Sequence, residues 1–90
     1  MELNKIVQET MKNLREIEEK LFLDTRTSLI LMNSNADCSD KNRNRVNYGA
    51  AIANAGILNF MGYKTEIFAY EEDGFLKADK FECNGNEIKL

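Results

Sequence analysis

The amino-acid sequence predicts an α+β two-layer sandwich within the broad α/β class, and three observations lead to it. Two stretches repeat apolar residues at helical spacing, and several short stretches are apolar or alternate as strands do. Two dipeptides typical of tight hairpins, Asp73-Gly74 and Asn84-Gly85, lie in the last third of the chain. The predicted order is α-β-α-β-β-β, with one parallel β-α-β crossover followed by an antiparallel meander. Ninety residues without a repeat or a linker predict a single domain, 1–90.

Residues 2–22 are predicted to form an amphipathic helix. One apolar stripe recurs at alternating intervals of four and three residues: Leu3, Val7, Thr10, Leu14, Ile17 and Leu21. This spacing leaves two interpretations open. The helix packs on its own sheet, which we favour because Thr10 interrupts the stripe, or it forms the seam of a two-stranded coiled coil.

The next segment, 26–32, is predicted to be a buried central strand, since Asp24 and Thr25 interrupt the helical pattern and Leu29 to Met32 form a short apolar run. A polar loop of about a dozen residues, 33–44, is expected to follow it. Within this loop Ser39, Asp40, Asn42 and Asn44 are all candidate N-caps for the next helix.

A second helix is predicted over residues 45–61. One face carries small and apolar residues: Val46, Gly49, Ala50, Ala53, Gly56, Ile57 and Phe60. We expect this face to pack closely on the sheet or on the first helix, with Ala51, Ala55 and Leu58 near the back. Gly62 is the predicted left-handed residue that ends the helix, with Tyr63 folding back towards Leu58.

Three strands, at 64–70, 75–83 and 87–90, are expected to follow as an antiparallel meander. With the strand predicted at 26–32 they form a four-stranded mixed sheet, and both helices are placed on one of its faces.

Composition excludes several functional classes. The chain has no histidine, which removes the commonest general base and the commonest metal ligand. Its net charge of −3 argues against a dedicated duplex-DNA binder, and the lack of an apolar run long enough to cross a bilayer argues against a membrane protein. The start of the chain lacks the basic and apolar stretches of a signal peptide, so we expect a cytoplasmic protein whose Cys38 and Cys83 stay reduced.

The predicted loop 33–44 is the candidate site, because it follows the carboxyl end of a predicted parallel strand and leads into a helix N-terminus. Its candidate ligand- or partner-binding residues are Asn33, Asn35, Asp37, Asp40, Lys41, Arg43 and Arg45. The alternative is a solvated loop whose polar side chains satisfy backbone groups and cap the helix.

The sequence predicts no catalytic residue, metal site or cofactor. The loop resembles a calcium loop in its alternating oxygen ligands, but Cys38 and Asn44 stand where glycine and a bidentate glutamate are needed. Cys38 has no histidine to activate it as a nucleophile. The adjacent acids, such as Glu71 and Glu72, are expected to form a solvated edge.

These observations favour a small non-enzymatic protein-interaction module, an inhibitor or adaptor of a larger macromolecule. A phage-type inhibitor of a bacterial defence protein is one concrete form, since the Asn-, Lys- and Ile-rich composition is typical of small accessory proteins of low-GC bacteria and their phages. The alternative is a small-ligand binder or minimal enzyme that takes a nucleotide or phosphorylated metabolite at 33–44. Because two apolar helices are hard to bury in 90 residues, we also predict a homodimer.

Overall fold

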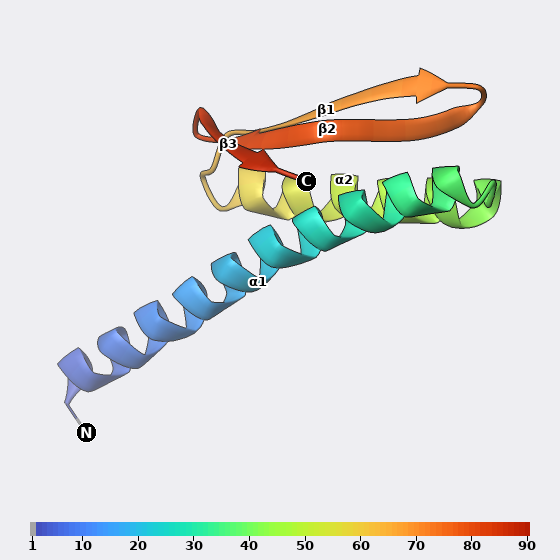
Figure 1. Ribbon diagram of the computed structural model, residues 1–90. Coiled ribbons are helices and arrows are strands. Elements are labelled where there is room, and N and C mark those ends of the chain that lie inside the picture. The colour runs from blue at the N-terminus through green and yellow to red at the C-terminus, as the bar shows by residue number, and fades with distance from the viewer. Residues whose placement is uncertain (1) are drawn as a thin grey trace.

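A computed structural model describes residues 2–90 as two helices followed by three strands. The helices are α1 (Leu3–Asp37) and α2 (Lys41–Phe60), and the strands are β1 (Thr65–Glu72), β2 (Phe75–Cys83) and β3 (Asn86–Lys89). The strands form one antiparallel sheet in the order β1-β2-β3. Both helices lie on the same face of this sheet (Figure 1). The α+β two-layer class is therefore confirmed, whereas the predicted order is wrong, and the order in the structure is α-α-β-β-β.

The segment predicted as a central strand, 26–32, is part of α1. Asp24 and Thr25 do not end the helix, because Thr25 is buried and its hydroxyl donates to the Leu21 carbonyl at 2.7 Å, within the helix itself. The chain has no proline, and its first glycine is Gly49, so nothing before residue 38 breaks a helix. A short apolar run fits a buried helix as well as a strand, and here α1 turns Leu29 and Met32 inward. The parallel crossover is therefore absent.

The predicted loop 33–44 is also mostly helical. Residues 33–37 form the last turns of α1 and residues 41–44 the first turn of α2, which leaves only Cys38, Ser39 and Asp40 between them. Ser39 adopts the left-handed conformation, with φ +57°, and the Asp40 N–H donates to the Asn35 carbonyl at 2.9 Å. Asp40 then caps α2 by accepting from the Arg43 N–H at 3.1 Å. A helix-terminating motif that uses serine instead of glycine joins two helices where a loop was expected.

The orientation of α2 is the reverse of the prediction. Ala51, Ala55 and Leu58, expected near the back, are the buried residues that face α1 and the sheet. The face expected to pack inward points to solvent. The core consists of Leu29 and Met32 from α1, Ala51 from α2, and Ala78 and Phe81 from β2.

The predicted turns of the C-terminal half are confirmed. Gly62 ends α2 with φ +104°, and the Tyr63 N–H donates to the Leu58 carbonyl at 3.0 Å. Positive φ values at Asp73-Gly74 and at Asn84-Gly85 form the two hairpin turns.

The two helices have unequal lengths, which gives the molecule its elongated shape. α2 runs back along α1 and ends beside its middle, where the Tyr63 hydroxyl donates to Glu18 at 2.7 Å and the Tyr63 ring meets Phe22 edge-to-face at 5.1 Å. The N-terminal part of α1, residues 3–17, extends beyond α2 and the sheet (Figure 1). The molecule measures 58 × 24 × 18 Å. We call residues 3–17 the overhang.

Candidate functional site

Asn33, a residue of the predicted site, and Asn44, a predicted N-cap candidate, bind the backbone of β2. The Asn33 side chain pairs with Ala78, donating to its carbonyl at 2.8 Å and accepting from its N–H at 2.9 Å. Asn44 pairs with Leu76 in the same way, at 2.8 and 2.9 Å, and also donates to the Met32 carbonyl at 2.9 Å. β3 pairs only with the end of β2 that begins at Lys80. The two amides therefore continue the sheet edge where no third strand is present.

Asn35 links the two helices, because its side-chain amide lies 2.6 Å from that of Asn47 on α2. Asn33, Asn35 and Asn44 together hold α1, α2 and β2 to one another by hydrogen bonds. These amides satisfy buried polar groups, as the solvated-loop alternative anticipated, but they do so across the fold instead of within a loop.

The charged residues of the predicted site do not converge on one point. Asp37 lies 3.9 Å from Lys77 on β2, Asp40 caps α2 and lies 3.7 Å from Arg43, and the Lys41 ammonium lies 5.6 Å from the centre of the Phe75 ring. Arg43 and Arg45 are exposed on the first turns of α2. The structure thus brings the amides together at β2 and leaves the two arginines facing solvent.

The described residues, 2–90, contain no group of three or more His, Cys, Asp or Glu side chains placed to hold a metal ion. Cys38 is exposed and Cys83 is buried, and both are free thiols. Burial raises the pKa of the Cys83 thiol, which lowers its reactivity. Neither α1 nor α2 carries an apolar stretch sufficient to span a lipid bilayer.

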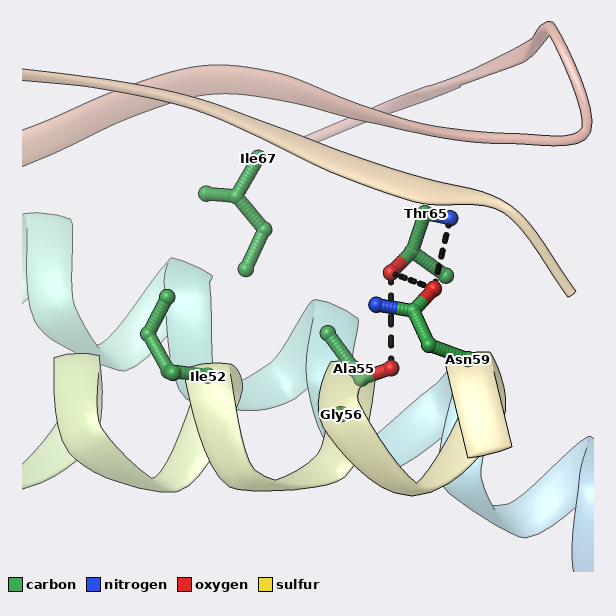
Figure 2. A pocket seen from close by; sticks show the side chains of 6 residues that line it. All are labelled: Ile52, Ala55, Gly56, Asn59, Thr65 and Ile67. Atoms are coloured by element: carbon green, nitrogen blue, oxygen red, sulfur yellow. Dashed lines mark hydrogen bonds between the residues drawn. The ribbon is translucent and has the colours of Figure 1, made fainter. Parts of the chain in front are cut away.

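A groove of about 260 Å³ lies between α2 and the edge strand β1 (Figure 2). It is lined by Ile52, Ala55, Gly56, Asn59, Thr65 and Ile67. Its polar groups bind one another, since Asn59 Oδ1 accepts from the Thr65 N–H at 2.9 Å and from its hydroxyl at 2.7 Å. The groove therefore offers apolar contact and no free reactive group.

The most unusual surface is the outer face of α2, which points away from α1 and the sheet. Its residues are all exposed: Val46, Gly49, Ala50, Ala53, Gly56, Ile57 and Phe60. Phe60 is 93% exposed and Val46 69% exposed. A Cβ atom added at Gly49 or at Gly56 would meet nothing within 4 Å, so the packing of this chain does not require glycine at either position. We call this surface the α2 outer face.

A second apolar surface lies on the overhang. Every residue from 2 to 17 is exposed, including six large apolar side chains: Leu3, Ile6, Val7, Met11, Leu14 and Ile17. The sequence pattern identified this stripe and the helical face 46–60, but it could not show that neither is covered within the chain. The sequence did indicate that apolar surface would remain exposed, because two helices with wide apolar faces are hard to bury within a short chain.

Comparison with protein-family models, curated proteins and solved structures finds no match to this chain.

Proposed function

We propose that this protein is a small non-enzymatic interaction module, an inhibitor or adaptor that binds a larger protein through the α2 outer face. The observation that carries the proposal is the exposure of a continuous apolar helix face with two glycines that have no role in internal packing. A mid-helix glycine costs about 1 kcal/mol relative to alanine. Close approach of a partner would offset this cost.

The size and shape of the face suit a docked helix or a flat apolar surface. From Val46 to Phe60 it extends over roughly 21 Å at 1.5 Å per residue. Large side chains at both ends flank a small centre formed by Gly49, Ala50 and Ala53. A partner segment would fit against the centre and be held by Val46 and Phe60 at the ends.

The charge distribution supports a partner with an acidic surface. α2 has three basic residues, Lys41, Arg43 and Arg45, and no acid, so its net charge is +3. The rest of the chain has 15 acids and 9 bases, a net charge of −6. A partner surface would complement α2 if it had an apolar patch and acidic residues that lie next to the start of α2. The acidic remainder of this chain would repel such a surface, which favours docking on α2. In this role Arg43 and Arg45 are partner-binding residues, as the sequence predicts.

We propose a cytoplasmic location, which two free thiols support because reducing compartments keep such pairs unbonded. A phage-type inhibitor of a bacterial defence protein is the form to test first. Its support is the composition.

The test compares two matched substitutions, each replacing a neutral exposed residue with arginine. Ala53→Arg places a large cation at the centre of the α2 outer face, and Gln8→Arg changes the polar side of the overhang. We expect affinity capture from host lysate to recover the same partner with the wild type and with Gln8→Arg, and to lose it with Ala53→Arg. Equal recovery by all three, or no partner from any, would contradict the proposal.

The small-ligand alternative is tested separately by thermal shift with nucleotides and phosphorylated metabolites. A ligand that binds only the folded state raises the melting temperature. We expect no shift, because the amides of Asn33 and Asn44 are already bound to β2. A shift that disappears in Arg43→Ala or Arg45→Ala would replace our proposal with the alternative.

A further inference from the structure

The overhang carries a heptad repeat that runs on along α1 into the body. Val7, Leu14, Leu21, Ser28 and Asn35 follow one another at seven-residue intervals. Leu21 and Ser28 are half-buried, and Asn35 contacts Asn47 of α2. The fully buried residues of α1 lie beside this row, so the body covers the row in part, whereas its apolar residues on the overhang are exposed.

We infer that the helix occupying this face is α1 of a second copy, in an antiparallel two-stranded coiled coil over residues 3–21. In heptad terms Val7, Leu14 and Leu21 are a positions, and Leu3, Thr10 and Ile17 are d positions. Antiparallel helices place a residues opposite d residues. This inference goes beyond the proposed function, which concerns a different surface, and does not depend on it.

One antiparallel register satisfies every layer. When opposed residues have numbers that sum to 24, Leu3 faces Leu21 of the second copy, Val7 faces Ile17, and Thr10 faces Leu14. Twofold symmetry repeats these three layers in reverse, which gives six layers over about 28 Å. Thr10, the residue that interrupts the stripe, is opposite a leucine in both of its layers and never opposite itself.

The flanking positions agree with this register. On the two flanks of the seam the neighbouring residues are offset by two positions, so their numbers sum to 22 or to 26. Met11 lies beside Met11 on one flank, which adds apolar contact, and Asn13 lies beside Asn13 on the other, which adds an amide pair. Further out, Lys20 lies beside Ile6, and its methylene groups can cover that side chain. These flanking pairs bring no like charges together, and the two Lys12 side chains, which lie level with each other, are on the outer side of the helices.

A parallel pair conflicts with α2. The second α1 would run on past Leu21 along the part of α1 on which α2 packs. In the antiparallel pair the two bodies lie at opposite ends, and only the first turn of each overhang reaches the level of Glu18 and Leu21, where α2 ends.

The charge of the overhang favours a protein partner over a lipid surface. Helices that lie on membranes are rich in Lys and Arg on their polar face. Residues 3–17 carry two acids, Glu9 and Glu16, and three bases, Lys5, Lys12 and Arg15, and four more charged residues of mixed sign, Glu2, Glu18, Glu19 and Lys20, lie next to them. This mixture of charges is typical of the solvent side of a coiled coil.

The first experiment measures mass by light scattering coupled to size exclusion. We expect about 20 kDa, twice the 10.3 kDa of the chain, at high protein concentration. Leu14→Glu places a charge in two layers and should return the mass to that of a single chain. Gln8→Glu, an equal change of charge on the outer side of the helix, should leave the dimer intact. Both side chains are exposed in the single chain, so neither substitution disturbs the fold.

The second experiment measures the orientation of the helices. Spin labels are attached one at a time to cysteines at Lys5, Lys12 and Glu19, in a Cys38→Ser background. All three side chains are exposed on the outer side of the helix. In the proposed register Lys12 lies level with Lys12 of the second copy, whereas Lys5 lies opposite residue 19 and is offset from its counterpart by 14 residues, about 21 Å.

We therefore expect the shortest distance between labels at Lys12 and longer distances at Lys5 and Glu19. Equal distances at the three sites would show a parallel pair, and a mass of 10.3 kDa at every concentration would show a monomer. Either result overturns the inference. Ala53→Arg should dimerise normally, so failure of the dimer and failure of the proposed function give different results.

Discussion

Asn44 and Leu76 are joined through both groups of the Asn44 amide, which accepts from the Leu76 N–H at 2.9 Å and donates to the Leu76 carbonyl at 2.8 Å. A neighbouring strand would make the same two bonds with this residue of β2. Asn33 repeats the arrangement two residues further along β2, at Ala78. Two side chains, one from each helix, thus take the place of a short strand. They hydrogen-bond the backbone groups of β2 at the part of its edge that β3 does not reach.

Removing this amide should cost much of the stability of the domain. Asn44 is 1% exposed, and Asn44→Ala leaves Leu76 and the Met32 carbonyl without their partners. We expect the free energy of unfolding to fall by about 2–4 kcal/mol, as measured by urea denaturation. Asn42→Ala, an exposed change on the same turn, is the control and should stay within about 0.5 kcal/mol of the wild type. A loss that is equal in both variants would contradict the strand-like role.

The α2 outer face predicts a conflict between stability and binding. Gly49→Ala and Gly56→Ala should each raise the free energy of unfolding by about 1 kcal/mol, because the added methyl meets nothing within 4 Å. The same changes should weaken capture of the partner, since they thicken the small centre of the face. Gly62→Ala is the control and should destabilise, because φ at Gly62 is +104°. Stabilised variants that bind as well as the wild type would show that close approach is not needed.

The connection between α1 and α2 contains a strained residue. Ser39 has φ +57°, a conformation that glycine adopts without the usual cost. Ser39→Gly should therefore raise the free energy of unfolding by about 0.5–1 kcal/mol, measured by urea denaturation. Ser39→Ala keeps the strain and should give no such gain. A loss of stability in Ser39→Gly would mean that the serine side chain has a role of its own.

The contact between Tyr63 and Glu18 predicts a dependence of stability on alkaline pH. The hydrogen bond to Glu18 raises the pKa of Tyr63 above its ordinary value, and burial and the nearby negative charge act in the same direction. The folded state therefore holds the phenol proton more tightly than the unfolded state. The resulting stabilisation is complete below about pH 10, the ordinary tyrosine pKa, and is lost as the pH rises through the raised pKa.

Thermal denaturation of the wild type and of Tyr63→Phe over this range separates the effect from other titrations. We expect the two melting temperatures to converge as the pH rises above about 10. A constant difference between them would show that the phenol proton contributes nothing.

The two cysteines should differ in reactivity. Cys38 is exposed, whereas Cys83 is buried and its pKa is raised by that burial. A thiol reagent should therefore modify Cys38 rapidly in the native protein and Cys83 only on unfolding. Cys38→Ser supplies the control, in which no rapid reaction remains. Rapid modification of both thiols in the wild type would show that the sheet opens easily at Cys83.

The turns, the helix end at Gly62 and the hairpins could be predicted from the sequence by itself, because each depends on a few neighbouring residues. Glycine or asparagine at a position of positive φ determines the turn wherever the rest of the chain lies. The amphipathic stripe from Leu3 to Leu21 was predictable for the same reason, since helical period is a local property. These local signals were enough for the α+β class.

Only the tertiary structure decided the rest. Whether Leu29 to Met32 form a strand or a helix depended on the partner they packed against, because a short apolar run fits both. Which side of α2 is buried depended on where α1 and the sheet lie, and this turned Ala51 inward and Phe60 outward. Asn33 and Asn44, both in the predicted loop 33–44, bind backbone groups up to 45 residues away along the chain, a relation that no local pattern records. Burial results from contacts between distant segments, so the fold determines which apolar faces stay open for a partner.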